Sequence, residues 1–289
     1  MNRTLVLTLA VLGAANIATA SRNHDRWPVR EQETIQKTFT LSEPPMRVVV
    51  DNIEGYVHVR ATTGSQVRFT AHKSIRAETD SDLRQAKDDV RLEITEKPGT
   101  LSIYYDAPWR CNGENNPCRD HGRHFYSVSY DIDMEVPRDA RVVLSTVNNG
   151  DINLEGTRGD FDVTGINGGI TMSDIGGSGR VHTINGPVTV RFAKNPAAPC
   201  DFKTLNGQLD VYFQPGLSAD LGFKTFNGEI YSDFDVTPRP VAEVATAERK
   251  GGRFVYRSNR LAAARVGSGG PELKFDAFNG NIRLHQAGK

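Results

Sequence analysis

Hydrophobic positions in the second half of the chain follow a repeat that is marked by the dipeptide Asn-Gly. The six copies are Asn149-Gly150, Asn167-Gly168, Asn185-Gly186, Asn206-Gly207, Asn227-Gly228 and Asn279-Gly280. Successive glycines are 18, 18, 21, 21 and 52 residues apart. The second residue after each glycine is apolar in all six copies, and the fourth is apolar in five. This recurrence indicates an internal structural repeat.

Each repeat predicts one β-strand on either side of the Asn-Gly corner. After the glycine, apolar and polar residues alternate, which is typical of a strand with one buried face. Five residues before the glycine, five of the six copies again carry an apolar residue, which predicts the second strand. Glycine has no Cβ and asparagine has a short amide side chain, so we interpret the pair as a tight turn with positive φ at both positions.

A repeat of 18 to 21 residues cannot cover its own apolar face, so neighbouring repeats have to stack on one another. We therefore predict an all-β fold, a single-stranded β-solenoid with its corners in register and their amides bonded from rung to rung. The alternative is an antiparallel β-hairpin meander or sandwich, because Asn-Gly is also a favoured hairpin turn. Two residues before the glycine, five copies carry Ile, Leu or Phe, which a hairpin would leave outside. We prefer the solenoid because its corner can turn this slot inward.

The remaining segments fit the same domain with less regularity. Around Gly55 the repeat recurs with Glu54 in place of asparagine, which we interpret as a degenerate first rung. Thr79 to Asp89 predicts a short helix, with Thr79 and Asp82 in a capping relation. The predicted solenoid domain spans residues 41–289, with degenerate rungs at 41–140, regular repeats at 141–236, a basic insertion at 237–270 and a last rung at 271–289.

Residues 1–20 have the layout of a secretory signal peptide. Arg3 precedes an apolar stretch, and Ala18-Thr19-Ala20 forms a cleavage site of the small-x-small type. The apolar stretch is too short to span a bilayer. We interpret residues 21–40 as an N-terminal extension, and we expect an exported protein of the periplasm or cell surface with no transmembrane segment in the mature chain.

The composition excludes several classes of protein. The 35 basic and 35 acidic residues cancel, so the chain has no overall positive field that would attract nucleic acid. Hydrophobic residues make up 38% of the chain, and no long apolar run follows the N-terminus, which excludes a polytopic membrane protein.

The cysteines are interpreted in the light of export. Cys111 and Cys118 flank a polar, turn-rich hexapeptide, and we predict a disulfide between them because exported proteins meet an oxidising compartment. A zinc site is the alternative, since His121 and His124 follow. Paired zinc-binding cysteines are usually about two to four residues apart, so we expect no metal site. Cys200 occupies a slot that is mostly apolar in the other copies, which predicts a buried, inert thiol.

Positive charge gathers in the insertion at 237–270. Seven basic residues stand there against two acidic ones. We take Arg253, Arg257 and Arg260 as candidate binding residues for cell-envelope polysaccharide, lipid headgroups or another envelope protein. A solvated loop or an edge hairpin with no binding role is the alternative.

Motifs of enzymatic chemistry are missing from the sequence. There is no nucleophile elbow, zinc-protease motif or phosphate-binding loop. Acidic pairs such as Asp131 and Asp133 alternate with apolar residues, which is typical of a solvent-facing strand surface. We therefore expect a protein that is not an enzyme and that needs no cofactor. The alternative is a carbohydrate-active β-helix enzyme, a polysaccharide lyase or glycosidase, in which paired carboxylates would converge in one groove.

The repeated pattern T-x-N-G-x-I-x-V, as in Thr183–Val190 and Thr204–Val211, resembles the bacterial putative-adhesin family of exported β-repeat proteins. The similarity covers about residues 45–289. It implies a β-solenoid at the bacterial envelope or surface and an adhesin-like or envelope-associated interaction scaffold, and it brings no catalytic residues. The loop from Cys111 to Cys118 and the basic insertion lie outside the shared repeat.

Overall fold

The computed structural model describes residues 27–41, 43–110, 124–240, 246–250, 253–257 and 261–288. The expected signal peptide over residues 1–20 and the predicted pairing of Cys111 with Cys118 lie outside these residues. Of the three candidate binding arginines, Arg260 also lies outside them. Arg253 and Arg257 are the first and last residues of strand β20 (Arg253–Arg257).

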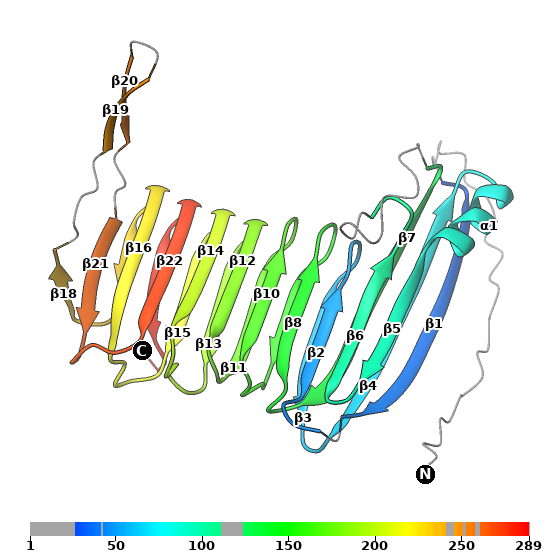
Figure 1. The fold of residues 1–289 in the computed structure, drawn as a ribbon, viewed down its shortest axis with the longest axis horizontal. Helices are drawn as coiled ribbons and strands as arrows, with labels where there is room; N and C mark the ends of the chain where they lie inside the picture. The colour runs from blue at the N-terminus through cyan, green and yellow to red at the C-terminus, as the bar shows by residue number, and fades with distance from the viewer. Residues whose placement is uncertain are drawn as a thin grey trace.

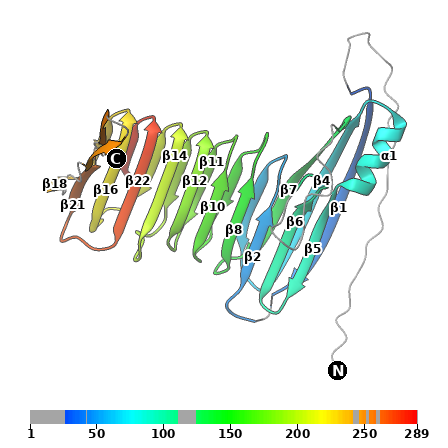
Figure 2. The same ribbon diagram turned by 45° about the horizontal axis from the view of Figure 1, so that its top comes forward.

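Two long mixed β-sheets lie face to face and form a layered body (Figures 1 and 2). The ten-strand sheet contains, in spatial order, β1 (Val29–Thr40), β4 (Gln66–Ala77), β7 (Tyr126–Pro137), β3 (Val57–Thr62), β9 (Ile152–Glu155), β11 (Ile170–Ile175), β13 (Val188–Phe192), β15 (Leu209–Phe213), β23 (Ile282–Gln286) and β17 (Ile230–Ser232). The eleven-strand sheet contains β18 (Val236–Arg239), β21 (Leu261–Val266), β16 (Ala219–Asn227), β22 (Glu272–Asn279), β14 (Cys200–Asn206), β12 (Gly179–Asn185), β10 (Phe161–Gly165), β8 (Arg141–Thr146), β2 (Arg47–Asp51), β6 (Thr100–Asp106) and β5 (Arg91–Lys97). The remaining strand, β19 (Thr246–Lys250), pairs with β20. The predicted all-β class is confirmed.

Each Asn-Gly repeat places one strand in each sheet. In one copy the chain runs along β12 in the eleven-strand sheet, turns at Asn185-Gly186 and continues along β13 in the ten-strand sheet. Equivalent strands of successive repeats pair in parallel, with Val163 opposite Val181 and Ile170 opposite Val188. Antiparallel pairs occur toward the two ends of the body, for example between β1 and β4 and between β16 and β21. The Asn-Gly corners of the repeats therefore follow one edge of the body.

The spatial order of the repeats differs from their order in the sequence. The last repeat lies between two earlier ones, because β22 pairs with both β14 and β16, and β23 pairs with both β15 and β17. At the other end, β2 and β3 lie directly beside β8 and β9, so the segment around Gly55 is the neighbour of the first Asn-Gly repeat. Between β17 and β22 the chain forms β18 to β21. It then returns, and the last repeat is inserted between two repeats that precede it in the sequence.

The apolar slots of the repeat fill the space between the sheets. Val188 and Val190, two and four residues after Gly186, are both fully buried. Large rings pack from repeat to repeat, and the ring of Phe275 is stacked between those of Phe202 and Phe223 with centroids 5.3 Å from each. Burial of this apolar surface, which stabilises by about 25 cal/mol per Å², is the main force that holds the repeats together.

The slot two residues before the corner glycine points outward, whereas we expected it to point inward. Ile184, Leu205 and Phe278 are 41%, 40% and 41% exposed, and Phe226 is 72% exposed. The reason is that β12, β14, β16 and β22 each continue as far as the asparagine, so their side chains keep alternating between the two faces up to the corner. The argument that this slot favours a solenoid over hairpins is therefore wrong.

The N-terminal end of the body combines strands with one helix. Val29–Thr40, expected to belong to an extension, forms the edge strand β1. Helix α1 (Asp80–Asp89) confirms the predicted helix and its capping box, since the Thr79 side chain accepts from the Asp82 N–H and the Asp82 carboxylate accepts from the Thr79 N–H. Among the described residues, no helix has the length and apolar character needed to cross a membrane.

Candidate functional site

Asparagine side chains form a hydrogen-bonded ladder along the corner of the body. Each amide nitrogen Nδ2 donates to the Oδ1 atom of the asparagine on the neighbouring repeat, at 2.8 to 3.0 Å. In spatial order the members are Asn148, Asn167, Asn185, Asn206, Asn279 and Asn227. The first copy contributes Asn148 in place of Asn149. It is Asn149 that adopts a left-handed φ of 54°. The ladder fixes the corners of successive repeats relative to one another.

Close approach of neighbouring backbones explains the corner glycines. A Cβ atom on Gly207 would lie 2.0 Å from the carbonyl oxygen of Gly186, and a Cβ on Gly280 would lie 1.8 Å from that of Gly207. Comparable clashes occur at the other corner glycines, which are Gly150, Gly168, Gly186 and Gly228. The expected turn with positive φ at both positions is not found in the six pairs, since Asn149 is the only corner asparagine with a positive φ, and the φ of 158° at Gly186 is nearly extended. Space, and not turn conformation, selects glycine here.

The threonine of the T-x-N-G pattern faces the interior, one residue before the outward slot. The Thr204 hydroxyl donates to the carbonyl oxygen of Gly186 at 2.9 Å, and that of Thr183 donates to Gly168 at 3.1 Å. Each bond joins a repeat to the corner of its neighbour. Threonine, asparagine and glycine therefore act together to hold the corner rigid.

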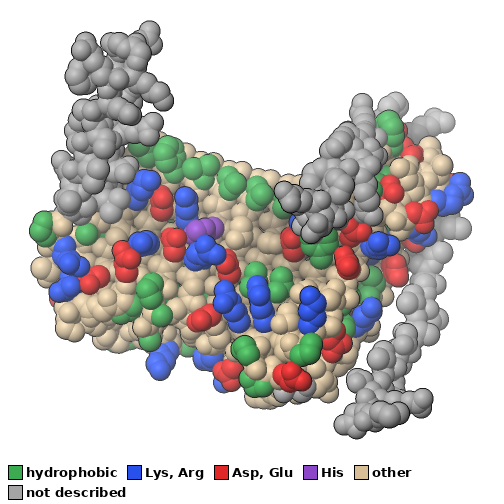
Figure 3. All heavy atoms as spheres, viewed as in Figure 1, with side chains coloured by type: hydrophobic (Ala, Val, Ile, Leu, Met, Phe, Trp, Pro, Cys, Tyr) green, Lys and Arg blue, Asp and Glu red, His purple; other side chains and the backbone are tan. Residues whose placement is uncertain are grey.

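The outward slots of five neighbouring repeats form a continuous apolar surface, which we call the corner row. Its members, in spatial order, are Ile166, Ile184, Leu205, Phe278 and Phe226. The rings of Phe226 and Phe278 are stacked, with centroids 5.0 Å apart and planes 6° from parallel. Figure 3 shows hydrophobic side chains in a row along the edge where β12, β14, β22 and β16 end. Neighbouring members are spaced by the separation of paired strands, about 4.8 Å.

A strip of polar residues borders the corner row on the outer face of the eleven-strand sheet. Each lies two residues before a member of the row, and the strip includes His182, Lys203, Asp276 and Lys224. The ammonium groups of Lys203 and Lys224 both lie 3.9 Å from the single carboxylate of Asp276. Two cations therefore share one anion beside the aromatic end of the row.

His182 faces a second acidic residue of this surface. Its Nε2 atom lies 3.2 Å from the Asp201 carboxylate. The neighbouring His182 imidazole, helped by Lys274 and Lys203, lowers the pKa of Asp201 below its ordinary value. This carboxylate is therefore held in its ionised form on the outer face.

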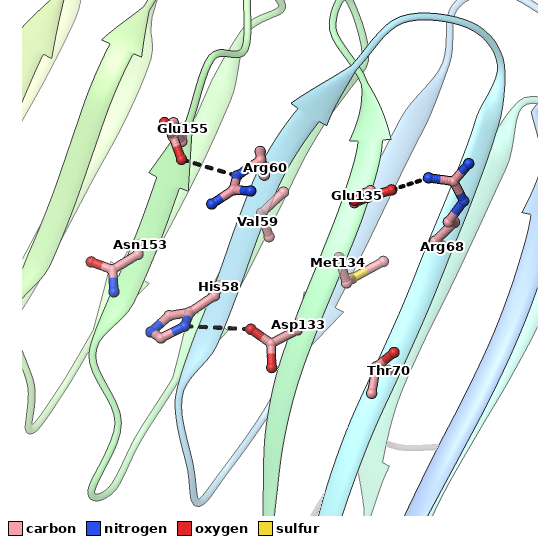
Figure 4. Close-up of a pocket in the computed structure, with 10 residues that line it drawn as sticks. All are labelled: His58, Val59, Arg60, Arg68, Thr70, Asp133, Met134, Glu135, Asn153 and Glu155. Atoms are coloured by element: carbon pink, nitrogen blue, oxygen red, sulfur yellow. Dashed lines mark hydrogen bonds and ion pairs between the residues drawn. The ribbon is translucent and has the colours of Figure 1, made fainter.

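The ten-strand sheet carries a shallow polar hollow on its outer face, with a volume of about 500 Å³. Figure 4 shows side chains of β9, β3, β7 and β4 around it. Arg60 Nε lies 3.1 Å from Glu155, His58 Nδ1 lies 3.5 Å from Asp133, and Arg68 pairs with Glu135. Each charged group that lines the hollow thus faces an opposite or protonatable partner on the next strand.

The pairing within the hollow limits its chemistry. The Tyr56 hydroxyl donates to Asp133 Oδ2 at 2.9 Å, and partial burial together with this carboxylate raises the pKa of Tyr56 to about 12. Asp131 accepts from the Tyr56 N–H at 3.1 Å. These carboxylates are committed to strand-to-strand contacts on an outer face, as the alternation of β7 predicts. Among the described residues, no group of three or more His, Cys, Asp or Glu side chains could hold a metal ion.

A second cluster crosses the ten-strand sheet near its other end. The Arg191 guanidinium lies over the ring of Tyr212, 3.6 Å from its centroid, and that ring is stacked on His285 at 4.3 Å. His285 Nε2 lies 3.1 Å from Asp210, and its Nδ1 lies 3.8 Å from Asp233. The stacking covers ring faces that a sugar could otherwise contact.

The residues that the sequence singled out lie in different parts of the structure. Cys200 is buried at 3% exposure, and burial raises the pKa of its thiol, which fits an inert core position. The Asn-Gly residues all lie at the corner. Sequence reasoning missed the corner row as a surface, although the signal, five large apolar residues in one slot, was visible.

Comparisons with known proteins give distant similarities. No family model matches the chain, and no curated protein matches it. A crystal structure of a putative cell adhesion protein from Clostridium sporogenes is 10% identical, with 89% of this chain and 100% of that chain covered and a TM-score of 0.41. A putative adhesin from Bacteroides fragilis is also 10% identical, with 88% and 97% covered and a TM-score of 0.32. A putative lipid binding protein from Parabacteroides distasonis is 13% identical, with 87% and 96% covered and a TM-score of 0.26.

Proposed function

We propose that this chain is a non-enzymatic β-solenoid scaffold of the cell envelope, adhesin-like in its role, which makes its contacts through the corner row. The observation that carries the proposal is the exposure of four large apolar side chains in register on neighbouring strands, Ile184, Leu205, Phe278 and Phe226, with the half-buried Ile166 beside them. An ordered apolar surface of this kind typically marks an interaction site, because exposed apolar area is unfavourable in water.

The solenoid interpretation is supported by the parallel registers of the repeats and by the asparagine ladder that joins them. Location at the envelope rests on the signal-peptide pattern of residues 1–20. The basic insertion with Arg253, Arg257 and Arg260 stays a prediction as a second contact site.

A non-enzymatic role is supported by the chemistry of the polar hollow. A glycosidase or lyase needs carboxylates or bases that are free to exchange protons with a bound sugar. Glu155, Glu135 and Asp133 are instead engaged with Arg60, Arg68 and His58 on neighbouring strands. Appearance of new reducing ends or unsaturated products from a panel of polysaccharides would contradict this part of the proposal.

Sedimentation with isolated bacterial envelopes tests the contact surface. The mature chain, residues 21–289, should sediment with the envelopes, and the double variant Leu205→Ser/Phe278→Ser should remain largely in the supernatant. Val236→Ser is the matched control, because Val236 is 41% exposed but pairs at the level of Ala219, at the opposite end of β16 from the corner. Equal sedimentation of the double variant and the unmodified chain would refute the proposal.

A further inference from the structure

We propose that the occupant of the corner row is the surface of a phospholipid bilayer, into which its side chains insert at the level of the headgroups. This inference rests on the proposed function, since it assigns a target to the same surface. It follows from four properties of the row: its small area, its straight alignment, its charged border and the chemistry of its side chains.

The area of the row is too small for a stable protein partner or a second copy of the chain. Four members of the row are 40% to 72% exposed and Ile166 is half-buried. Since even a large aromatic side chain buries only about 150–250 Å², the whole row presents on the order of 400 Å². A standard protein interface needs about 800 Å² from each partner. A bilayer has no such threshold, because each apolar side chain that enters it contributes independently.

The alignment of the row suits a flat target. Ile184, Leu205, Phe278 and Phe226 occupy the same slot on parallel strands whose registers match, with Asn206 opposite Asn185 and Asn279 opposite Asn206. Their side chains therefore reach the same height along a line that crosses the strands. When the strands stand upright on a plane, these four exposed side chains meet it together. The asparagine ladder and the stacked rings of Phe226 and Phe278 hold this arrangement in place before binding.

The border of the row suits phosphate headgroups. Lys203 and Lys224 lie on one side and share the Asp276 carboxylate, so two ammonium groups face one carboxylate beside the row. Their long stems allow the ammonium groups to rise toward headgroups while the apolar row lies deeper. On the other side lie the neutral amides of the ladder. Of the residues that follow the glycines of these five repeats, Gly169, Pro187, Gln208, Asn281 and Glu229, one is acidic.

The side chains of the row favour lipid over polysaccharide. Ile166, Ile184 and Leu205 have no aromatic face or hydrogen-bonding group with which to orient a sugar. The two phenylalanine rings lie face to face, so each covers a face of the other. Aliphatic and phenyl groups without polar atoms transfer favourably from water into a lipid interface.

Vesicle flotation tests the inference with the mature chain. Two kinds of vesicle are used, phosphatidylcholine alone and phosphatidylcholine with one-third phosphatidylglycerol. We expect the unmodified chain to float with both and to bind the anionic vesicles several-fold more strongly. Leu205→Ser/Phe278→Ser should lower the partition coefficient at least tenfold, whereas Val236→Ser should leave it unchanged. Lys203→Gln/Lys224→Gln should remove most of the preference for anionic vesicles.

Two further measurements keep the outcome decisive. Thermal unfolding shows whether each variant is folded, and Phe226→Ser replaces the double variant if the latter is not, because Phe226 is 72% exposed. The variant Phe226→Trp reports whether the side chain at position 226 enters the bilayer. The emission of the added tryptophan should shift to shorter wavelength when vesicles are added.

The results separate the bilayer from other partners. If the unmodified chain does not float with either vesicle, or if the row variants float as well as the unmodified chain, the bilayer inference is overturned. Absence of flotation combined with row-dependent sedimentation with envelopes would leave the proposed scaffold function in place and point to an envelope protein or polysaccharide. Row-independent sedimentation would overturn the proposed function itself.

Discussion

The Phe275 ring is sandwiched between the rings of Phe202 and Phe223, which belong to the repeats on either side of it in space. Because Phe275 is in the last repeat, this sandwich joins three segments that are separated along the chain. The last repeat thus packs between two repeats that precede it in the chain and connects their cores.

Replacement of Phe275 by alanine tests this role. Phe275 is 1% exposed, and a cavity of this size in a rigid core should cost about 3–5 kcal/mol of unfolding free energy. Phe278→Ala is the control on the same strand, since Phe278 is 41% exposed and should cost about 1 kcal/mol through loss of its stacked partner. Denaturant unfolding of both variants measures the difference. Similar losses for the two would show that the last repeat does not pack as described.

A methyl group at a corner glycine should destabilise the stack. In Gly207→Ala the new Cβ would lie 2.0 Å from the Gly186 carbonyl oxygen, so the backbones of two repeats would have to separate. We expect a loss of about 3 kcal/mol. Gly222→Ala is the matched control on β16, where the nearest atom, Lys274 Cγ, lies at 3.9 Å. That variant should be neutral or more stable by up to about 1 kcal/mol, because alanine loses less backbone entropy than glycine. Thermal melts of the two variants decide the point.

The asparagine ladder should become sensitive to pH when one amide is replaced by a carboxyl group. In Asn206→Asp an ionised side chain cannot donate to Asn185 Oδ1, whereas the protonated acid can. Folding should therefore raise the pKa of the new carboxyl group above its unfolded value of about 3.9. The variant should approach the stability of the unmodified protein at low pH and lose stability as pH rises through the raised pKa. Asn206→Ala should show a loss of about 1 kcal/mol that does not change with pH. Urea unfolding at several pH values, with the unmodified chain as reference, measures this dependence. A difference in stability between Asn206→Asp and the unmodified chain that does not change with pH would contradict the ladder.

A buried lysine at the N-terminal end should make stability depend on pH at the alkaline side. Lys73 is 7% exposed, its Nζ donates to the Val90 carbonyl at 3.2 Å, and burial lowers its pKa from the ordinary value. The unfolded chain therefore binds this proton more tightly, so stability rises with pH between the lowered pKa and about 10.4. Lys73→Met should flatten this rise without loss of stability at neutral pH, because Val90 keeps a bond from the Tyr130 hydroxyl.

Stability measured against pH for Lys73→Met and for Lys37→Met checks this expectation. Lys37 is an exposed lysine on the edge strand β1, so its replacement should leave the profile unchanged. An unaltered slope in Lys73→Met would show that the Lys73 ammonium does not lose its proton on folding over this range.

Several features could be predicted because they depend on neighbours in the chain. The strand alternation around Val188 and Val190 and the cap formed by Thr79 and Asp82 are set by residues a few positions apart. The recurrence of Asn-Gly, at spacings of 18 to 21 residues as far as Gly228, also predicted a rung-to-rung amide network, because it places the same side chain at each corner. The alternation and the cap are short-range consequences of side-chain direction and hydrogen-bonding capacity, so the sequence alone determines them.

Tertiary structure decided the features that depend on competition between distant segments. Which strand lies beside β14 is a choice among several similar edges. In the structure β22 occupies this edge, and Phe275 stacks there between Phe202 and Phe223. The outward direction of Leu205 follows from where its strand ends, which pairing with neighbouring strands sets. The corner glycines are likewise required by the close approach of a carbonyl group on another repeat. Long-range packing therefore converted a local pattern into an exposed apolar row.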